Sequence, residues 1–135
     1  APYQQLSSDL LAVSDWIIPN ETEFRELNGD LPTSDAILKD FRPGKNSIVT
    51  LGSQGAAFIT ADRELTRIAA PNVIAVDTTG AGDAFWTGFL YARLLGKDFE
   101  QTITIAQKLA VLKLQNVGRL PEGINIQEYL GAKIK

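Results

Sequence analysis

Residues 77–83 read Asp-Thr-Thr-Gly-Ala-Gly-Asp, and the chain on either side of them decides the fold class. The apolar residues Val73–Val76 predict a strand before this stretch, and apolar residues at helical spacing predict a helix after it, ending before Gly96. The helix residues concerned are Phe85, Phe89, Leu90, Leu94 and Leu95. Glycines between a strand and a helix let an anion reach the uncovered backbone amides at the helix N-terminus. The sequence therefore predicts an anion site at Gly80.

Asp83 falls in the first turn of this predicted helix, and two interpretations of it stay open. An acid at that position is favoured by the helix dipole, which is a structural role. Alternatively, a carboxylate beside an anion site can take the proton from a hydroxyl group that attacks phosphorus. Phosphoryl transfer requires mainly positioning and charge neutralisation, so neither histidine nor cysteine is needed. The amides after Gly80 would face the charge that develops on the leaving ADP.

The rest of the chain predicts strands that alternate with helices. We expect strands at Trp16–Ile18, Ser47–Leu51 and Ala56–Thr60, a hairpin around Asp62–Arg63, and helices near residues 6–13 and at Asn20–Gly29, Thr33–Phe41, Phe99–Gln115 and Ile126–Ala132. Short β-branched runs bounded by Gly or Pro favour buried strands. This alternation indicates a layered α/β sandwich whose sheet contains parallel strands.

Composition excludes several classes of function. The chain has 135 residues, of which 44% are hydrophobic and 21% charged, as expected for one globular domain. Its net charge of -3 offers no basic surface for nucleic acid. There is no cysteine and no histidine, so a metal ion would have to be held by oxygen. The absence of a long apolar run argues against a membrane protein and favours the cytoplasm.

Three motifs resemble those of the ribokinase-like, or PfkB, sugar kinases. Residues 77–85 resemble the second signature of that family, residues 15–23 its Asn-Glu-x-Glu segment, and residues 50–56 its nucleotide loop. Their order along the chain also matches, which outweighs the separate structural alternatives. The resemblance covers nearly the whole chain, residues 1–135, as the C-terminal nucleotide-binding and catalytic half of such a kinase. It implies a three-layer α/β sandwich with a central, mostly parallel sheet, incomplete in this chain.

The resemblance also implies roles for individual residues. Asp83 would be the catalytic base, and Gly80, Ala81 and Gly82 would form the anion hole. Asn20 and Glu23 would lie near the phosphates, with Glu23 acting on Mg²⁺ through water. ATP would be contacted, mainly through backbone groups, by Thr50, Leu51, Gly52, Ser53, Gln54, Gly55 and Ala56, while Gln107 would border the adenine. The structural alternatives are a solvated first-turn acid for Glu23, a tight strand connection for residues 50–56, and a surface glutamine for Gln107.

A monovalent-cation site, which would take K⁺, is implied by the same resemblance. Its ligands would be Asp77, the carbonyl groups of Thr79, Lys113 and Asn116, and Gly118. The alternative for Asp77 is an acid that caps the turn with its side-chain oxygen. Glu122 stands where ribokinases usually have a small hydroxyl residue, and this departure leaves the potassium requirement open.

The resemblance implies ATP-dependent phosphorylation of a sugar hydroxyl, with ribose as the first substrate to consider. Alternatives are a kinase for fructose, a sugar acid, a nucleoside or a vitamin B6 alcohol, and a non-catalytic nucleotide-binding module. The family's paired-glycine sugar site and its β lid, which usually mediates dimerisation, are not in the sequence. We therefore expect the natural protein to be longer, or a partner to supply the rest, with a homodimer of the full-length protein left open.

Overall fold

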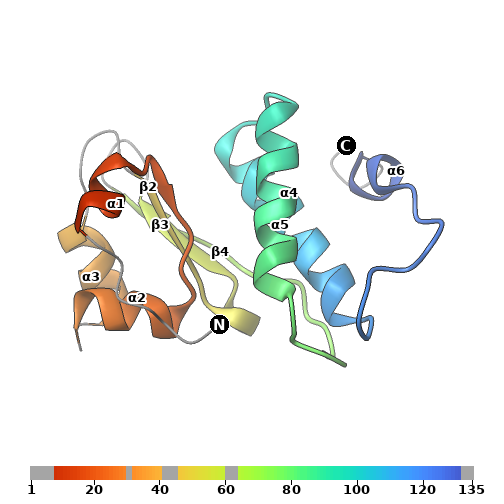
Figure 1. Cartoon of the computed structure of the whole chain (residues 1–135), viewed down its shortest axis with the longest axis horizontal. Helices are drawn as coiled ribbons and strands as arrows, with labels where there is room; N and C mark the ends of the chain where they lie inside the picture. The colour runs from red at the N-terminus through yellow and green to blue at the C-terminus, as the bar shows by residue number, and fades with distance from the viewer. Residues whose placement is uncertain (1–7, 30–31, 41–45, 60–63, 132–135) are drawn as a thin grey trace. The chain divides into compact units, whose positions relative to one another are not determined.

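The computed structural model describes residues 8–29, 32–40, 46–59 and 64–131 (Figure 1). The chain divides into two compact units, Ala1–Arg67 and Ile68–Lys135, and each is described by itself. Within the described residues no helix is both long and apolar enough to cross a membrane.

The first unit is built on a mixed sheet. In chain order its elements are α1 (Ser8–Val13), β1 (Trp16–Ile17), α2 (Glu21–Asn28), α3 (Thr33–Asp40), β2 (Asn46–Thr50), the 3-10 turn η1 (Gly52–Gln54), β3 (Ala56–Ile59) and β4 (Leu65–Ile68). The strands lie in the order β1-β2-β3-β4, with β1 parallel and β3 antiparallel to β2. The parallel pair is the one that matters for the site, because it brings the carboxyl ends of β1 and β2 to the same edge of the sheet.

Helices α2 and α3 cover one face of this sheet. Phe24 and Ile37 pack against Val49 and Ala57, and all four are buried. Ile48 is also fully buried, and because successive side chains point to opposite faces, both faces of β2 are shielded from water. Burial of a side chain such as Phe24 contributes about 1.5–3 kcal/mol. β2 is therefore an interior strand, as the α/β prediction requires.

The second unit is helical in its described part. It contains α4 (Ala81–Leu94), α5 (Phe99–Leu114) and α6 (Ile126–Gly131), and α4 lies alongside α5 (Figure 1). The two helices approach closely at Gly88, where an added Cβ atom would lie 2.8 Å from Ala106 Cα. Leu130 of α6 packs with Ala92 and Ile105, so α6 closes one side of the α4 and α5 pair.

Within the described residues, the structure confirms the predicted helices and strands outside residues 73–95, to within one or two residues at their ends. The predicted ends at residues 6–7, Phe41, Thr60 and Ala132 lie outside the described residues. The predicted strand at Val73–Val76 is wrong. The backbone N–H of Val76 donates to the carbonyl of Leu114 over 2.8 Å, and Ile74 is 88% exposed. β-Branched residues favour a strand only where a neighbouring strand can pair with them, and among the described residues no strand pairs with this segment.

The predicted apolar face of the helix after Gly80 is correct only in part. Phe85 and Phe89 are buried, whereas Leu90, Leu94 and Leu95 are exposed. Periodicity indicates which residues share a face but not how far along the helix a neighbour covers it. The predicted hairpin at Asp62–Arg63 lies outside the described residues, although the strands on either side of it, β3 and β4, are neighbours in the sheet.

Candidate functional site

The N-terminus of α4 carries no side-chain cap. Its N-cap residue is Gly80, with φ 78° and ψ 7°, a left-handed conformation that favours glycine. Ala84 N–H makes the first helical hydrogen bond, to the carbonyl of Gly80, and Ala81 N–H donates to the carbonyl of Thr78 over 3.3 Å. Among the described residues the N–H groups of Gly82 and Asp83 have no acceptor. Two amides therefore remain free at the positive end of the helix dipole.

The N-termini of two other helices, α2 and α5, differ from that of α4 because side chains cap them. The N-cap residue Asn20 of α2 accepts a hydrogen bond from Glu23 N–H over 2.9 Å, and the Glu23 carboxylate accepts one from Asn20 N–H over 2.9 Å. Asp98 and Gln101 form the same reciprocal capping box at α5. A capping box satisfies the first amides of a helix from its own side chains. With glycine at its N-cap position, α4 has no such side chain, so its amides stay available to a ligand.

Asp83 is the third residue of α4 and its side chain is exposed. Its backbone carbonyl accepts a hydrogen bond from Thr87 Oγ1 over 2.8 Å. No hydrogen bond or ion pair occupies its carboxylate within the part of the chain that the structure describes. An exposed carboxylate beside two free amides has the arrangement that a general base for phosphoryl transfer requires.

Asp77 holds the turn that leads into α4. Its Oδ1 accepts a hydrogen bond from Thr79 N–H over 2.9 Å, and its Oδ2 accepts one from Gly118 N–H over 3.5 Å. Hydrogen bonding by Thr79 is the main reason why the pKa of Asp77 lies below its ordinary value, with smaller contributions from Gly118 and from the nearby Lys113 ammonium. Asp77 thus caps the turn, as one half of its structural alternative predicted, but it does not end a strand, because no described strand immediately precedes it.

Several of the residues predicted as monovalent-cation ligands lie near Asp77. The carbonyl of Lys113, which was predicted as one of these ligands, accepts a hydrogen bond from Asn116 N–H over 3.1 Å. It is the Lys113 side chain that reaches Asp77, with Nζ 3.9 Å from Oδ2. Sequence reasoning missed this contact, although a lysine among the apolar positions of a helix was the signal that could have indicated it.

The predicted nucleotide residues of the first unit meet at one edge of its sheet. Asn20 follows β1 and pairs with Thr50 at the end of β2, and Thr50 N–H donates to the carbonyl of Pro19 over 3.0 Å. The loop after Thr50 is closed by a hydrogen bond of 2.7 Å from Leu51 N–H to the carbonyl of Gly55. Ligands of α/β sheets bind at the carboxyl ends of the parallel strands. Asn20, Glu23 and the exposed loop residues Gly52, Ser53 and Gln54 lie at such an edge.

Gln107 is buried, and its side-chain amide donates to the carbonyl of Ile68 over 3.0 Å. The alternative of a surface glutamine is therefore wrong.

The predicted site residues fall into two groups, one in each unit of the chain. The first unit contains Asn20, Glu23 and residues 50–56. The second unit contains Asp77, Thr79, residues 80–83, Gln107, Lys113, Asn116 and Gly118.

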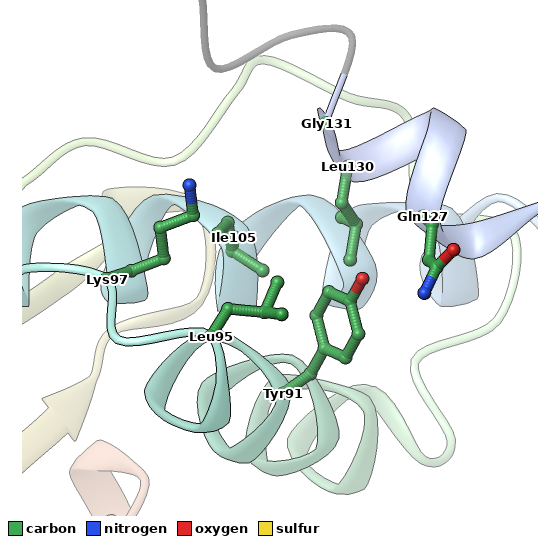
Figure 2. A pocket seen from close by; sticks show the side chains of 7 residues that line it. All are labelled: Tyr91, Leu95, Lys97, Ile105, Gln127, Leu130 and Gly131. Carbon is green, nitrogen blue, oxygen red and sulfur yellow. The ribbon is translucent and has the colours of Figure 1, made fainter.

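A cavity of about 280 Å³ lies elsewhere in the second unit, between α4, α5 and α6 (Figure 2). Its lining is largely apolar, and Figure 2 shows Tyr91 and Leu130 pointing toward one another across it. Tyr91 lies ten residues along α4 from Ala81, which corresponds to about 15 Å at 1.5 Å per residue. This cavity is therefore separate from the free amides and from Asp83.

The chain is similar to known carbohydrate kinases in both sequence and structure. Residues 1–121 match the model of the pfkB family carbohydrate kinases. A ribokinase from Arabidopsis thaliana is 37% identical over 124 residues, which are 86% of this chain and 32% of that protein. The crystal structure of a ribokinase from Thermotoga maritima superimposes with a TM-score of 0.83 and 29% identity, over 97% of this chain and 46% of that one.

Two similar structures contain ligands. Arabidopsis thaliana ribokinase, solved in complex with ribose and ATP, has a TM-score of 0.77 and 32% identity over 91% of this chain and 42% of that one. A candidate ribokinase II from E. coli, solved with ATP and Mg²⁺, has a TM-score of 0.76 and 28% identity over 90% of this chain and 39% of that one. The chain spans less than half the length of each of these relatives. On the family match and these similarities, the chain belongs to the pfkB family of carbohydrate kinases.

Proposed function

We propose that this chain carries the nucleotide-binding and catalytic part of an ATP-dependent kinase that phosphorylates a sugar hydroxyl, with ribose as the first substrate to test. The observation that carries the proposal is the uncapped N-terminus of α4, with the exposed carboxylate of Asp83 beside its free amides. Membership of the pfkB family supports the same reaction class.

In this proposal the glycine motif stabilises charge and Asp83 moves a proton. The free N–H groups of Gly82 and Asp83 face the negative charge that develops on the nucleotide as the terminal phosphoryl group leaves. Asp83 takes the proton of the sugar hydroxyl as that hydroxyl attacks phosphorus. The anion hole was predicted at Gly80, Ala81 and Gly82. The N–H of Ala81 is less available to a ligand, because it already donates to the carbonyl of Thr78 within the turn.

The nucleotide loop and α2 supply the remaining contacts. Residues 50–56 present backbone groups to ATP, and Asn20 and Glu23 lie at the same sheet edge. Among the described residues there is no cluster of three or more carboxylates that could enclose a metal ion. Glu23 alone would act on Mg²⁺ through water, which suits an ion that keeps several waters and binds mainly to phosphates. Magnesium would neutralise phosphate charge, as the E. coli structure with ATP and Mg²⁺ supports.

The rest of the enzyme is also part of the proposal. Because the chain spans 32% of the Arabidopsis ribokinase that it resembles, sugar recognition is assigned to residues outside the printed sequence. The structure of that ribokinase with ribose and ATP supports ribose as the acceptor. Because the β lid of this family usually mediates dimerisation, the proposal includes a homodimer of the full-length protein. The family resemblance also implies a monovalent-cation site, for K⁺, near Asp77.

The test is a turnover assay on the full-length protein with ATP, Mg²⁺ and a panel of acceptors: ribose, fructose, a sugar acid, a nucleoside and a vitamin B6 alcohol. We expect ADP formation with a sugar, and the largest kcat/KM with ribose. ATP binding without turnover on any acceptor would contradict the proposal and favour a non-catalytic nucleotide-binding module.

A further inference from the structure

The side-chain ammonium of Lys113 is buried next to the glycine motif. Lys113 lies in the last turn of α5, and its side chain is only 10% exposed. Its Nζ lies 3.9 Å from Asp77 Oδ2 and donates a hydrogen bond of 3.4 Å to the carbonyl of Asn116. Charged side chains are rarely buried to this extent unless they are paired. Lys113 and Asp77 therefore form an ion pair within the second unit, in which the lysine side chain is largely buried and the aspartate side chain is 25% exposed.

This ion pair adjoins the start of α4. A Cβ atom on Gly80 would lie 3.4 Å from Lys113 Cε, which is an ordinary van der Waals contact. Gly80 is the N-cap residue of α4, and Asp77 holds Thr79 N–H in the preceding turn. The lysine thus supports the turn on which the free amides depend, and it places a positive charge close to them.

The oxygen atoms around Asp77 do not fit a free monovalent cation in addition to this lysine. Oδ1 is bonded to Thr79 N–H, and Oδ2 is shared between Gly118 N–H and the ammonium. The carbonyl of Asn116 accepts from the same ammonium. A second cation at these oxygens would have to share one carboxylate with Lys113, and like charges at such short distances repel each other.

We propose that the ammonium of Lys113 takes the place of a monovalent cation beside the anion hole, so that the kinase needs no potassium. Lys113 is a positioning residue in this role, because it acts on the α4 turn through Asp77 and Gly80. This inference rests on the proposed function, since it concerns the same anion hole.

The contacts of Glu122 support this inference. Glu122 occupies the position where the family resemblance calls for a small hydroxyl residue near the cation. Its carboxylate instead forms an ion pair of 2.5 Å with Arg119, and both side chains are exposed. Glu122 is therefore not used as a cation ligand, and the tethered charge of Lys113 makes such a ligand unnecessary.

The first test measures the turnover of the full-length wild-type protein with ATP and its sugar in KCl, NaCl and tetramethylammonium chloride. All three salts are used at the same ionic strength of about 0.1 M, so that general screening is equal. We expect the three rates to agree within about twofold, since a bound ammonium cannot be exchanged for an ion. Activation by K⁺ of about fivefold or more would overturn the inference, because coupling of that size indicates an exchangeable cation.

The second test uses Lys113→Ala, which removes the charge and leaves space for an ion. In tetramethylammonium chloride we expect kcat to fall by about 10–100-fold, which is the usual effect of removing a residue that supports an active site from outside it. The KM for the sugar should change little. KCl or ammonium chloride should restore most of kcat. Lys113→Met keeps the aliphatic packing but fills the space, so kcat should fall without rescue. Lys97→Ala, which removes another lysine of the second unit, should behave as wild type in every salt.

A thermal-unfolding measurement separates this inference from the proposed function. K⁺ should raise the Tm of Lys113→Ala above its value in tetramethylammonium chloride and leave the Tm of the wild type unchanged, because only the variant can bind the ion. This readout needs no turnover, so it still applies if no acceptor is phosphorylated. A K⁺-dependent Tm in the wild type, or a Lys113→Ala variant whose Tm and kcat both ignore K⁺, would contradict the inference.

Discussion

Asp77 holds the turn before α4 through its Oδ1, which accepts from Thr79 N–H, while its Oδ2 accepts from the distant Gly118 N–H. Its capping role could be predicted from its place before Thr-Thr-Gly, because an aspartate side chain commonly bonds a backbone N–H two residues on. The partner of its second oxygen could not, since Lys113 and Gly118 are distant in sequence. At the scale of a residue, local hydrogen bonds are therefore predictable and long-range charge pairing is not.

The Asp77 and Lys113 pair predicts a non-additive effect on stability. Asp77→Asn should lower the Tm of the protein, because it leaves the ammonium of Lys113 buried without its counter-charge. Adding Lys113→Met should recover part of that loss, since the unpaired charge is then gone. Thermal unfolding of the wild type, both single variants and the double variant tests this coupling. Strictly additive shifts in Tm would show that the two side chains do not interact.

Glu23 allows a capping role to be separated from a role with magnesium. Glu23→Gln keeps the capping box, because glutamine serves at the third helical position as Gln101 does in α5. The free energy of unfolding should therefore stay within about 0.5 kcal/mol of wild type. The Mg²⁺ concentration that gives half-maximal turnover should rise.

The matched control for this change is Glu21→Gln, which alters an exposed acid on the same turn. It should leave the magnesium dependence as in wild type. If Glu23→Gln and Glu21→Gln gave the same magnesium dependence, Glu23 would have a capping role only.

At the scale of elements, most helices and strands could be predicted, and the failures share a cause. Residues Asn20–Gly29 have a cap, an apolar face and a glycine stop, and α2 forms there with Phe24 buried. Val73–Val76 has the β-branched composition of a strand but lies against the end of α5. Local signals define an element, whereas pairing and coverage depend on neighbours that periodicity does not identify.

The crossing of α4 and α5 predicts a cost for a small substitution. Gly88→Ala would place a Cβ atom 2.8 Å from Ala106 Cα and 3.1 Å from the carbonyl oxygen of Ile105. Overpacking of this kind costs about 1–3 kcal/mol, while the better helix propensity of alanine returns up to about 1 kcal/mol. We expect a net loss of about 1–2 kcal/mol in the free energy of unfolding, measured by urea denaturation.

Gly131→Ala is the control for this prediction, because nothing lies within 4 Å of the added Cβ atom at the end of α6. It should be neutral or slightly stabilising. An equal effect of the two substitutions would show that the close approach at Gly88 is not a constraint.

At the scale of the whole molecule, the α/β class and the family could be predicted because three motifs occur in a specific order. The family match over residues 1–121 and the superposition on a ribokinase with a TM-score of 0.83 confirm both. For the candidate site, the sequence predicted which residues belong to it but not how they are arranged. What could not be predicted was which backbone amides would be free and which side chain would lie beside Asp77, because both depend on how the helices pack.

The most direct test of the proposed chemistry is the kcat of full-length protein carrying Asp83→Asn, measured together with its dissociation constant for ATP. The change removes a proton acceptor of nearly the same size, so kcat should fall by about 10²–10⁴-fold. ATP affinity should stay within about threefold of wild type, since the loss is confined to the transition state. Asp98→Asn, an acid-to-amide change at the start of α5 that keeps a good N-cap residue, should leave both quantities unchanged. An Asp83→Asn variant that turns over at the wild-type rate would contradict the account.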